Sequence, residues 1–497
     1  MELLNQLSRR QYIDGEWVNS SNEETRKIIN PYNQEVIFEV AEGTSEDSER
    51  AILAARNAFE GSEWSQETSE SRGKKVGAIA DLIVEHREEL ARLETLDTGK
   101  TLEESYADMD DIANVFNYFA GLADKDGGEI IDSPIPNTES KVIKEPVGVV
   151  TQITPWNYPL LQASWKIAPA LVTGCTLVMK PSEITPLTTI RVFELMAEVR
   201  FPKGVINLVL GKGSEVGEPL SSHKEVDLVS FTGGIQTGKH IMKQAANHVT
   251  NVALELGGKN PNIIFDDADF DLAVDQALNG GFFHAGQVCS AGARILVHND
   301  IKDKFEAALI ERIKNIKLGD GFNPETEMGP VISAEHREKI EKYMEVAKSE
   351  NATIAIGGKR PEREDLQDGF FFEPTVITDC DTSMRIVQEE VFGPVVTIEG
   401  FSTEAEAIEL ANDSIYGLAG GVFTSDIGKA ERVVNKLKMG TVWINDFHPY
   451  FAQAPWGGYK QSGIGRELGK EGLAEYQVEK HILRNTNPEP VNWFGKQ

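Results

Sequence analysis

Two stretches of the sequence hold side chains suited to covalent catalysis. Cys289 ends the run Gly286-Gln287-Val288-Cys289, in which small neighbours leave space around a thiol. Glu255 lies in Leu254-Glu255-Leu256-Gly257-Gly258-Lys259, where an apolar stretch gives way to a glycine turn. A thiol nucleophile with a carboxylate base supplied from another strand is a recurring catalytic pair. Taken singly, each residue has a plain structural explanation, because a lone cysteine is more often a small buried hydrophobic residue and such a glutamate often ends a strand.

Length, charge and cysteine content narrow the class of protein. A chain of 497 residues is too long for one hydrophobic core, so we expect two or three domains. A net charge of −30 argues against nucleic acid or an anionic membrane surface as a partner. The cysteines Cys175, Cys289 and Cys380 form neither a disulfide framework nor a metal-binding spacing, which favours a reducing compartment and no metal site. No secretory signal and no apolar run near the ~18 residues of a membrane span is evident, so we expect a cytoplasmic protein.

The amino-terminal quarter is predicted to be helical, from about residue 45 to residue 123. Ser45 is a plausible N-cap, and a second long helix is expected from about 70 to 97, ending at Gly99. The stretch 130–144 contains two prolines and is predicted to form an exposed hairpin, because proline is excluded from central strands. We interpret this hairpin as a protruding arm.

From residue 147 onward, apolar β-branched runs alternate with helical patterns. This alternation predicts a parallel, doubly wound sheet with ligands bound beyond the carboxyl ends of its strands, followed by a second α/β region. The expected strands are 147–153, 176–179, 206–210, 227–231 and 252–256 in the first region, and 294–297, 395–398, 418–423 and 441–444 in the second. Helices are expected at 160–172, 188–199 and 236–247, and the tail 472–485 is expected to hold a short helix and an extended segment.

The link between the fourth of these strands and its helix is a candidate nucleotide site. Its run Phe231-Thr232-Gly233-Gly234 lets backbone N–H groups approach a pyrophosphate at a helix N-terminus, although a plain glycine turn explains it equally well. No Gly-x-Gly-x-x-Gly run follows the first strand, so the usual dinucleotide fingerprint is absent. Glu183 follows the second strand, where a carboxylate accepts hydrogen bonds from a ribose diol and repels a 2′-phosphate. These features favour NAD over NADP.

Seven motifs occur in the same order as in a known family. They are Thr154-Pro155-Trp156-Asn157, Met179-Lys180-Pro181-Ser182-Glu183, Phe231-Thr232-Gly233, Leu254-Glu255-Leu256-Gly257-Gly258-Lys259, Gly286-Gln287-Val288-Cys289, Glu389-Glu390-Val391-Phe392-Gly393-Pro394 and Pro455-Trp456-Gly457-Gly458-Tyr459-Lys460-Gln461-Ser462-Gly463. With these motifs the chain resembles the aldehyde dehydrogenase superfamily over nearly its whole length. The resemblance implies an α/β, aldehyde dehydrogenase-like fold. Its parts would be a doubly wound parallel-sheet NAD-binding domain (1–126 and 147–256), an α/β catalytic domain (257–468) and a protruding oligomerisation arm (127–146 and 469–497).

The resemblance also implies a role for each site residue. Cys289 would be the nucleophile, the Asn157 amide and the Cys289 backbone N–H would hold the oxyanion, and Glu255 would be the base for thioester hydrolysis. Lys166 would either join a proton path with Glu255 or be an ordinary helix lysine. The residues expected to bind NAD are Ile153, Thr154, Trp156, Lys180, Glu183, Gly213, Phe231, Gly233, Gly234, Leu256, Glu390 and Phe392. The family often has a hydroxyl residue at the position of Gly234, so one pyrophosphate contact is expected to be missing.

Aromatic residues are concentrated around the expected substrate tunnel. Aromatic faces attract cations, and a quaternary ammonium ion, which donates no hydrogen bond, suits a cage of such rings. Tyr158, Trp165 and Trp456 resemble the aromatic box of the betaine aldehyde dehydrogenases, and residues 443–453 resemble their bacterial members. The expected substrate contacts are Tyr158, Trp165, Phe283, Val288, Ser290, His448, Tyr450 and Trp456. The resemblance therefore implies NAD-dependent oxidation of betaine aldehyde to glycine betaine, the last step of osmoprotectant synthesis from choline.

Other substrates and reactions remain open. A broad-specificity enzyme acting on uncharged aldehydes would also have an aromatic tunnel, and a primary aminoaldehyde such as 4-aminobutanal would need a carboxylate, for which Asp446 is the candidate. A thiol hydrolase using Cys289 with His284 or His448 would leave the nucleotide motifs unexplained. A catalytically inactive NAD-binding protein would not need Cys289, Glu255 and Asn157 together. The arm predicts a dimer or tetramer, in which a neighbouring subunit completes an exposed strand edge.

Overall fold

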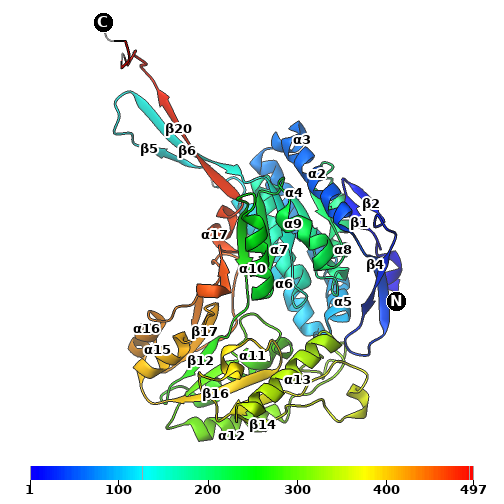
Figure 1. The fold of residues 1–497 in the computed structure, drawn as a ribbon, viewed down its shortest axis with the longest axis vertical. Helices are drawn as coiled ribbons and strands as arrows, with labels where there is room; N and C mark the ends of the chain where they lie inside the picture. The colour runs from blue at the N-terminus through cyan, green and yellow to red at the C-terminus, as the bar shows by residue number, and fades with distance from the viewer. Residues whose placement is uncertain (1, 126, 492, 496–497) are drawn as a thin grey trace.

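Two open α/β sheets and a projecting arm make up the fold, shown in Figure 1 as a computed structural model that describes residues 2–125, 127–491 and 493–495. The first sheet has eight strands in the order β19-β11-β10-β7-β8-β9-β1-β2. Its strands are β1 Gln11–Ile13, β2 Glu16–Val18, β7 Val149–Ile153, β8 Thr176–Lys180, β9 Ile206–Leu208, β10 Leu228–Thr232, β11 Asn251–Glu255 and β19 Gly463–Ile464. The run from β11 to β9 is parallel throughout, which confirms the predicted doubly wound sheet.

Both faces of this sheet are covered by helices, which explains why β7 to β10 are mostly apolar and are buried at almost every position. Val178 packs in a core with α2 and α10, whereas its neighbour Leu177 packs in the larger core with α7 and α8. Successive side chains of a strand point to opposite faces, so two buried faces require a continuous apolar run. The helices of this block are α1 Glu2–Gln6, α2 Ser45–Glu60, α3 Ser62–Ser65, α4 Ser69–Glu85, α5 Arg87–Thr98, α6 Leu102–Leu122, α7 Pro159–Thr173, α8 Leu187–Glu198, α9 Glu218–Ser222 and α10 Ile235–Ala245.

The amino-terminal helices differ in detail from the prediction. Ser45 is the first residue of α2 and not its cap; Thr44 is the N-cap, in a capping box with Asp47. The expected single helix over 70–97 is two helices, because His86 leaves the helical region (φ −99°, ψ 18°) between α4 and α5. The predicted stop at Gly99 is confirmed, since Gly99 adopts the left-handed conformation with φ 79°.

The second sheet has seven strands in the order β14-β15-β16-β13-β12-β17-β18. Its strands are β12 Pro261–Ile264, β13 Arg294–His298, β14 Thr353–Ile356, β15 Thr375–Thr378, β16 Val395–Phe401, β17 Ala419–Phe423 and β18 Thr441–Ile444. The four expected strands are confirmed, while β12, β14 and β15 were not predicted, nor were the amino-terminal β1, β2 and the pair β3 Thr25–Ile29 and β4 Val36–Ala41. Its helices are α11 Phe270–Phe282, α12 Lys302–Ile313, α13 Ala334–Ser349, α14 Arg385–Gln388, α15 Glu404–Asn412 and α16 Ile427–Val434.

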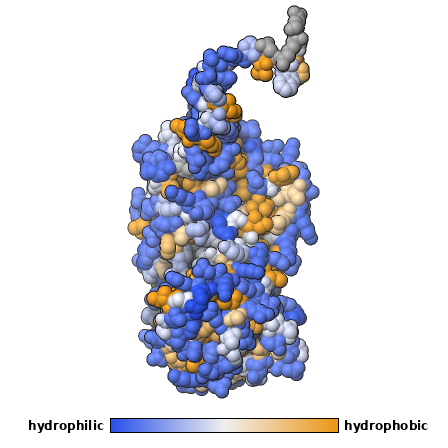
Figure 2. Space-filling view, turned by 90° about the vertical axis from the view of Figure 1, so that its left-hand side faces the viewer, coloured by the Kyte–Doolittle hydropathy of each residue, from blue (hydrophilic) through white to orange (hydrophobic). Residues whose placement is uncertain are grey.

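The arm is a three-stranded antiparallel sheet that stands clear of the remaining surface (Figures 1 and 2). It consists of β5 Glu129–Ile131, β6 Thr138–Pro146 and β20 Gln477–Asn485, which follows the short helix α17 Gly469–Ala474. This confirms the predicted hairpin and the short helix and extended segment predicted for the tail. The tail strand pairs with β6 from Gln477↔Pro146 to Asn485↔Thr138. Within the described ranges, no helix combines the length and the apolar character that a membrane crossing requires.

Candidate active site

Cys289 lies where two cavities meet. The first, here called the glycine cavity, has a volume of about 220 Å³ and is lined by the Thr232–Gly234 turn, Glu255 and Glu390. The second, here called the aromatic cavity, has a volume of about 330 Å³ and opens on the other side of the thiol. The residues that line both cavities are Tyr158, Gln162, Cys289 and Trp456. A molecule in either cavity therefore reaches the same sulfur atom.

A tight left-handed turn delivers Cys289 to this position. After α11, His284, Ala285 and Gly286 have φ values of 51°, 53° and 67°. A side chain at Gly286 would start 2.2 Å from the carbonyl oxygen of Gly393, so only glycine fits. Gln287 holds the turn in place: its Nε2 donates to His284 O at 3.2 Å and its Oε1 accepts from Ile332 N at 2.9 Å.

Asn157 reaches the same loop from the end of β7. Its Nδ2 donates to Gln287 O at 2.8 Å, and its side chain lines the glycine cavity beside Cys289. Burial and, to a smaller extent, the carboxylates of Glu255 and Glu390 raise the pKa of the Cys289 thiol to about 12. The thiol is therefore protonated at neutral pH unless a nearby positive charge offsets the effects of burial and of these carboxylates.

Glu255 ends β11 and is held by pairing with Gly463 of β19. Burial and the charge of Glu467 raise the pKa of Glu255 well above its usual range, while Lys166 opposes the shift. Lys166 is fully buried and forms an ion pair with Glu467, so a chain of ionisable groups leads from Glu255 into α7. Sequence reasoning missed Glu467, which belongs to no motif; its backbone pairs with that of Trp456 across an isolated bridge.

The predicted cofactor residues lie in three places, and Gly213 lies apart from all of them. Those that line the glycine cavity are Trp156, Gly233, Gly234, Leu256, Glu390 and Phe392. Those buried at strand ends outside it are Thr154, Lys180 and Phe231, with half-buried Ile153 beside them. Glu183 accepts from Lys180 Nζ at 3.2 Å and lines a separate cleft next to α13. Gly213 is exposed at the start of the turn Gly213–Gly217 and lines none of these cavities.

Two glycines are required by close packing at this end of the sheet. A side chain at Gly233 would start 2.5 Å from the ring of Phe231, and one at Gly257 would start 2.2 Å from a carboxylate oxygen of Glu390. The Glu390 carboxylate accepts from Gly258 N at 2.9 Å, which fixes it against the Gly257-Gly258 turn. The glycine run after β11 thus lets Glu390, which precedes β16 of the second sheet, approach the end of the first sheet.

The predicted substrate residues all line the aromatic cavity. They are Tyr158, Trp165, Phe283, Val288, Ser290, His448, Tyr450 and Trp456. The rings of Trp165, Tyr450 and Trp456 form a continuous wall, with centroid separations of 5.4, 6.0 and 6.1 Å. Trp165 and Trp456 are only 3% and 6% exposed, so the wall is largely shielded from water.

Two carboxylates that the sequence did not suggest also line this cavity. Asp111 accepts a hydrogen bond from Tyr450 Oη at 2.7 Å, and Asp108 pairs with the buried Lys100 at 2.6 Å. The expectation for Asp446 is wrong: it is exposed, outside the cavity, and accepts from Gln276 Nε2 at 3.3 Å. The physical reason is that the next residue, Phe447, is buried against Trp443, which turns Asp446 toward solvent.

The two histidines considered as partners of the thiol are bonded elsewhere. His284 donates its backbone N–H to Glu104 at 2.9 Å, and its ring packs 5.2 Å from that of Tyr158. His448 Nδ1 lies 3.4 Å from Ser290 Oγ, and burial lowers its pKa to about 4. Within the described part of the chain, no hydrogen bond joins either ring to Cys289 Sγ. This geometry speaks against a thiol hydrolase.

Comparisons with known proteins agree with this geometry. Residues 17–482 match the model of the aldehyde dehydrogenase family. The chain is 67% identical to the betaine aldehyde dehydrogenase of Bacillus subtilis over 489 residues, covering 98% of this chain and 100% of that one. It is 48% identical to aminoaldehyde dehydrogenase 2 of Zea mays, covering 97% of this chain and 96% of that one. The structure of Staphylococcus aureus betaine aldehyde dehydrogenase in complex with NAD+ is 83% identical, with a TM-score of 0.99 over 100% of this chain and 98% of that one.

Proposed function

Since the chain belongs to the aldehyde dehydrogenase family, we propose that it oxidises betaine aldehyde to glycine betaine, with NAD as the hydride acceptor. One observation carries the choice of substrate. An aromatic wall of buried Trp165 and Trp456 and half-buried Tyr450 lines a cavity that ends at Cys289. Such a wall binds a trimethylammonium group by cation–π attraction, while the aldehyde carbon two bonds away faces the thiol.

The proposed reaction begins with addition of Cys289 to the aldehyde. The Cys289 thiol first gives its proton to Glu255, which lines the same cavity. The sulfur then forms a bond to the carbonyl carbon, and the carbonyl π electrons move to oxygen, giving a thiohemiacetal oxyanion. The hydrogen bond from the Asn157 amide to Gln287 O places this amide beside Cys289 and leaves its second N–H free to donate to the oxyanion. The single backbone N–H of Cys289 is the other donor. When bound, NAD accepts the hydride that leaves this carbon as the adduct becomes a thioester.

Residues in and beside the glycine cavity fit this cofactor. The hydroxyls of Thr154 and Thr232 are buried at the ends of β7 and β10 without hydrogen-bond partners in the described structure, so they can serve a polar ligand. No atom lies within 4 Å of the Cβ position of Gly234, which leaves the N-terminus of α10 open to a phosphate. We propose that Glu390 and Phe392 hold the nicotinamide end and that Glu183 with Lys180 holds the adenosine ribose.

The second half of the proposed reaction is hydrolysis of the thioester. Glu255 takes a proton from water, the hydroxyl oxygen bonds to the acyl carbon, and the carbon–sulfur bond breaks to release the acid and the thiolate. The raised pKa of Glu255 suits a base that must accept this proton near neutral pH. We propose that the buried pair Lys166 and Glu467 relays the proton away from Glu255.

Oxidation of a primary aminoaldehyde is a second candidate function. The carboxylates of Asp108 and Asp111 line the aromatic cavity, and either could pair with a primary ammonium group. A relative named aminoaldehyde dehydrogenase 2, from Zea mays, is 48% identical to this chain over 490 residues. The two functions differ in the protein groups that bind the cationic end of the substrate. A primary ammonium group requires a carboxylate, whereas a quaternary ammonium group requires aromatic faces.

Assembly, location and pathway are part of the same proposal. We propose the division into domains given above, with β19 completing the edge of the NAD-binding sheet next to β11. The arm leaves Ile130 92% exposed on β5, which supports a homotetramer or dimer in which another copy covers this strand. All three cysteines are unpaired, which supports a cytoplasmic location. The role in osmoprotectant synthesis from choline follows from betaine aldehyde as the proposed substrate.

A comparison of three aldehydes tests the proposed function. NADH absorbance would be followed with betaine aldehyde, 4-aminobutanal and the neutral isostere 3,3-dimethylbutanal, with Cys289→Ala as the control. We expect the highest kcat/KM for betaine aldehyde and no turnover in the variant. A higher kcat/KM for 4-aminobutanal would favour the second candidate, and equal turnover of the neutral isostere would contradict a cation-binding wall.

A further inference from the structure

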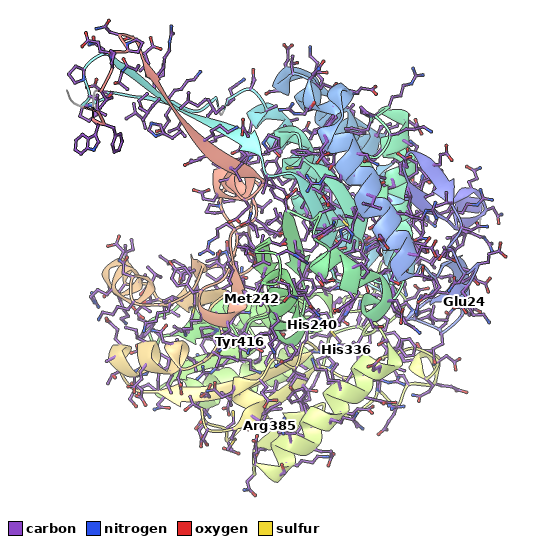
Figure 3. All side chains as sticks on the ribbon, turned by 45° about the horizontal axis from the view of Figure 1, so that its top comes forward. Glu24, His240, Met242, His336, Arg385 and Tyr416 are labelled. Carbon is purple, nitrogen blue, oxygen red and sulfur yellow. The ribbon has the colours of Figure 1, made fainter. Side chains whose placement is uncertain are left out.

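His336 joins the two blocks of the fold at the proposed cofactor site. It lies in the first turn of α13, where its backbone N–H donates to the N-cap Ser333 at 3.1 Å. Figure 3 shows it at the boundary between the two blocks, and it lines both the glycine cavity and the cleft next to α13. Nothing in the reaction described above uses this residue.

The His336 ring is held in a closed cluster of three rings. Its Nε2 lies 2.6 Å from the carbonyl oxygen of Phe392, a hydrogen bond in which the ring N–H donates. Its ring stands edge-on to Trp156, with centroids 5.0 Å apart, and Trp156 in turn stands edge-on to Phe392 at 5.3 Å. Burial lowers the pKa of His336 to about 4, so the ring is neutral at neutral pH and keeps a single N–H to donate.

Phe392 needs such support because its backbone is strained. It has a φ of 62°, a left-handed conformation that is uncommon for a bulky side chain. Backbone strain of this kind persists only where neighbouring groups hold it. The same helix braces the next residue, since Ile340 occupies the space where a side chain of Gly393 would start, 2.4 Å away.

We propose that His336 is a positioning residue for NAD, acting through the backbone carbonyl of Phe392 and through the Trp156 ring. The hydrogen bond fixes the left-handed turn, and the turn aims the Phe392 ring into the glycine cavity. Ile332, the residue before the N-cap of α13, donates its backbone N–H to Gln287 Oε1, so one helix end contacts both the cofactor side and the thiol side of the site. The inference rests on the proposed function only in its use of NAD.

Two substitutions distinguish the contribution of the His336 hydrogen bond to NAD binding from that of its aromatic ring. His336→Phe keeps an aromatic ring and loses the donor, whereas His336→Gln keeps a donor of similar reach. Glu338→Gln, an exposed change on the same helix, is the matched control. The Kd for NAD would be measured by titration calorimetry without aldehyde, and kcat and both KM values by steady-state kinetics.

Loss of one neutral hydrogen bond predicts that His336→Phe weakens NAD binding about 2- to 12-fold, with the KM for aldehyde unchanged. His336→Gln should return the Kd to within about 2-fold of wild type, and Glu338→Gln should match wild type. An unchanged Kd in His336→Phe would overturn the inference, as would an equal loss in His336→Gln. Should His336→Phe not fold, His336→Leu carries the same prediction. A wild-type protein that binds no NAD would instead refute the proposed function.

Discussion

Replacement of Trp456 by leucine tests how the cationic substrate is selected. Trp456 is one of three rings whose centroids lie 5.4–6.1 Å apart, and it is 6% exposed. A cation–π contact contributes about 0.5 kcal/mol when exposed and about 2 kcal/mol when desolvated. At 1.36 kcal/mol for each factor of ten, loss of one ring should lower kcat/KM for betaine aldehyde about 2- to 30-fold more than for a neutral aldehyde. The burial of Trp456 places the expectation near the upper value.

The assay compares betaine aldehyde with 3,3-dimethylbutanal, in which carbon replaces the charged nitrogen. The two substrates have the same shape, so packing lost with the ring affects both and cancels in the ratio of their kcat/KM values. Trp493→Leu, in the exposed tail, is the control and should leave the ratio unchanged. An equal fall for both substrates in Trp456→Leu would refute the reasoning, since the ring would then act only as apolar surface.

Three further changes probe the catalytic groups and the cofactor loop. Asn157→Ala should lower kcat about 10²- to 10³-fold by removing an oxyanion donor, and unchanged kcat with normal alkylation of Cys289 would contradict that role. Glu467→Gln removes a negative charge that raises the pKa of Glu255. Glu255 then loses its proton at lower pH, so the acidic limb of the profile of kcat against pH should shift to lower pH. A shift of this limb to higher pH would exclude the coupling. Gly234→Ser places its side chain in open space at the start of α10, with φ −72°, and should tighten NAD binding and add about 0.3 kcal/mol of stability, measured by calorimetry and thermal unfolding. Weaker NAD binding in that variant would contradict a phosphate site at this helix.

The sequence predicted the strands that alternate with helices in the first sheet, and it missed other elements for local reasons. The strands β7 to β11 are mostly apolar runs, and the structure confirms them. The strand β12 follows β11 without a helix between them and begins with Pro261, a residue that argues against a central strand. The break at His86 is equally hidden, because a single non-helical residue does not disturb the apolar pattern on either side.

Local sequence patterns also decided which residues of the site could be predicted. The motif residues could be named because each stands in a run with a recognisable neighbour pattern. Glu467, His336 and Asp111 could not, because each acts through a partner that is distant in sequence: Lys166, Phe392 and Tyr450. Asp446 was misplaced for a related reason, since residues 445–448 leave the strand pattern and alternate spacing no longer decides which side chain faces inward.

Trapping of the acyl-enzyme tests the central claim most directly. The variant Glu255→Gln would be mixed with betaine aldehyde and NAD, digested, and the peptide that contains Cys289 analysed by mass spectrometry. The account predicts a burst of NADH that stops after about one turnover and a betaine acyl group on the Cys289 sulfur, because the base for hydrolysis has been removed. A variant that continues to form NADH while Cys289 stays unmodified would contradict covalent catalysis by this thiol.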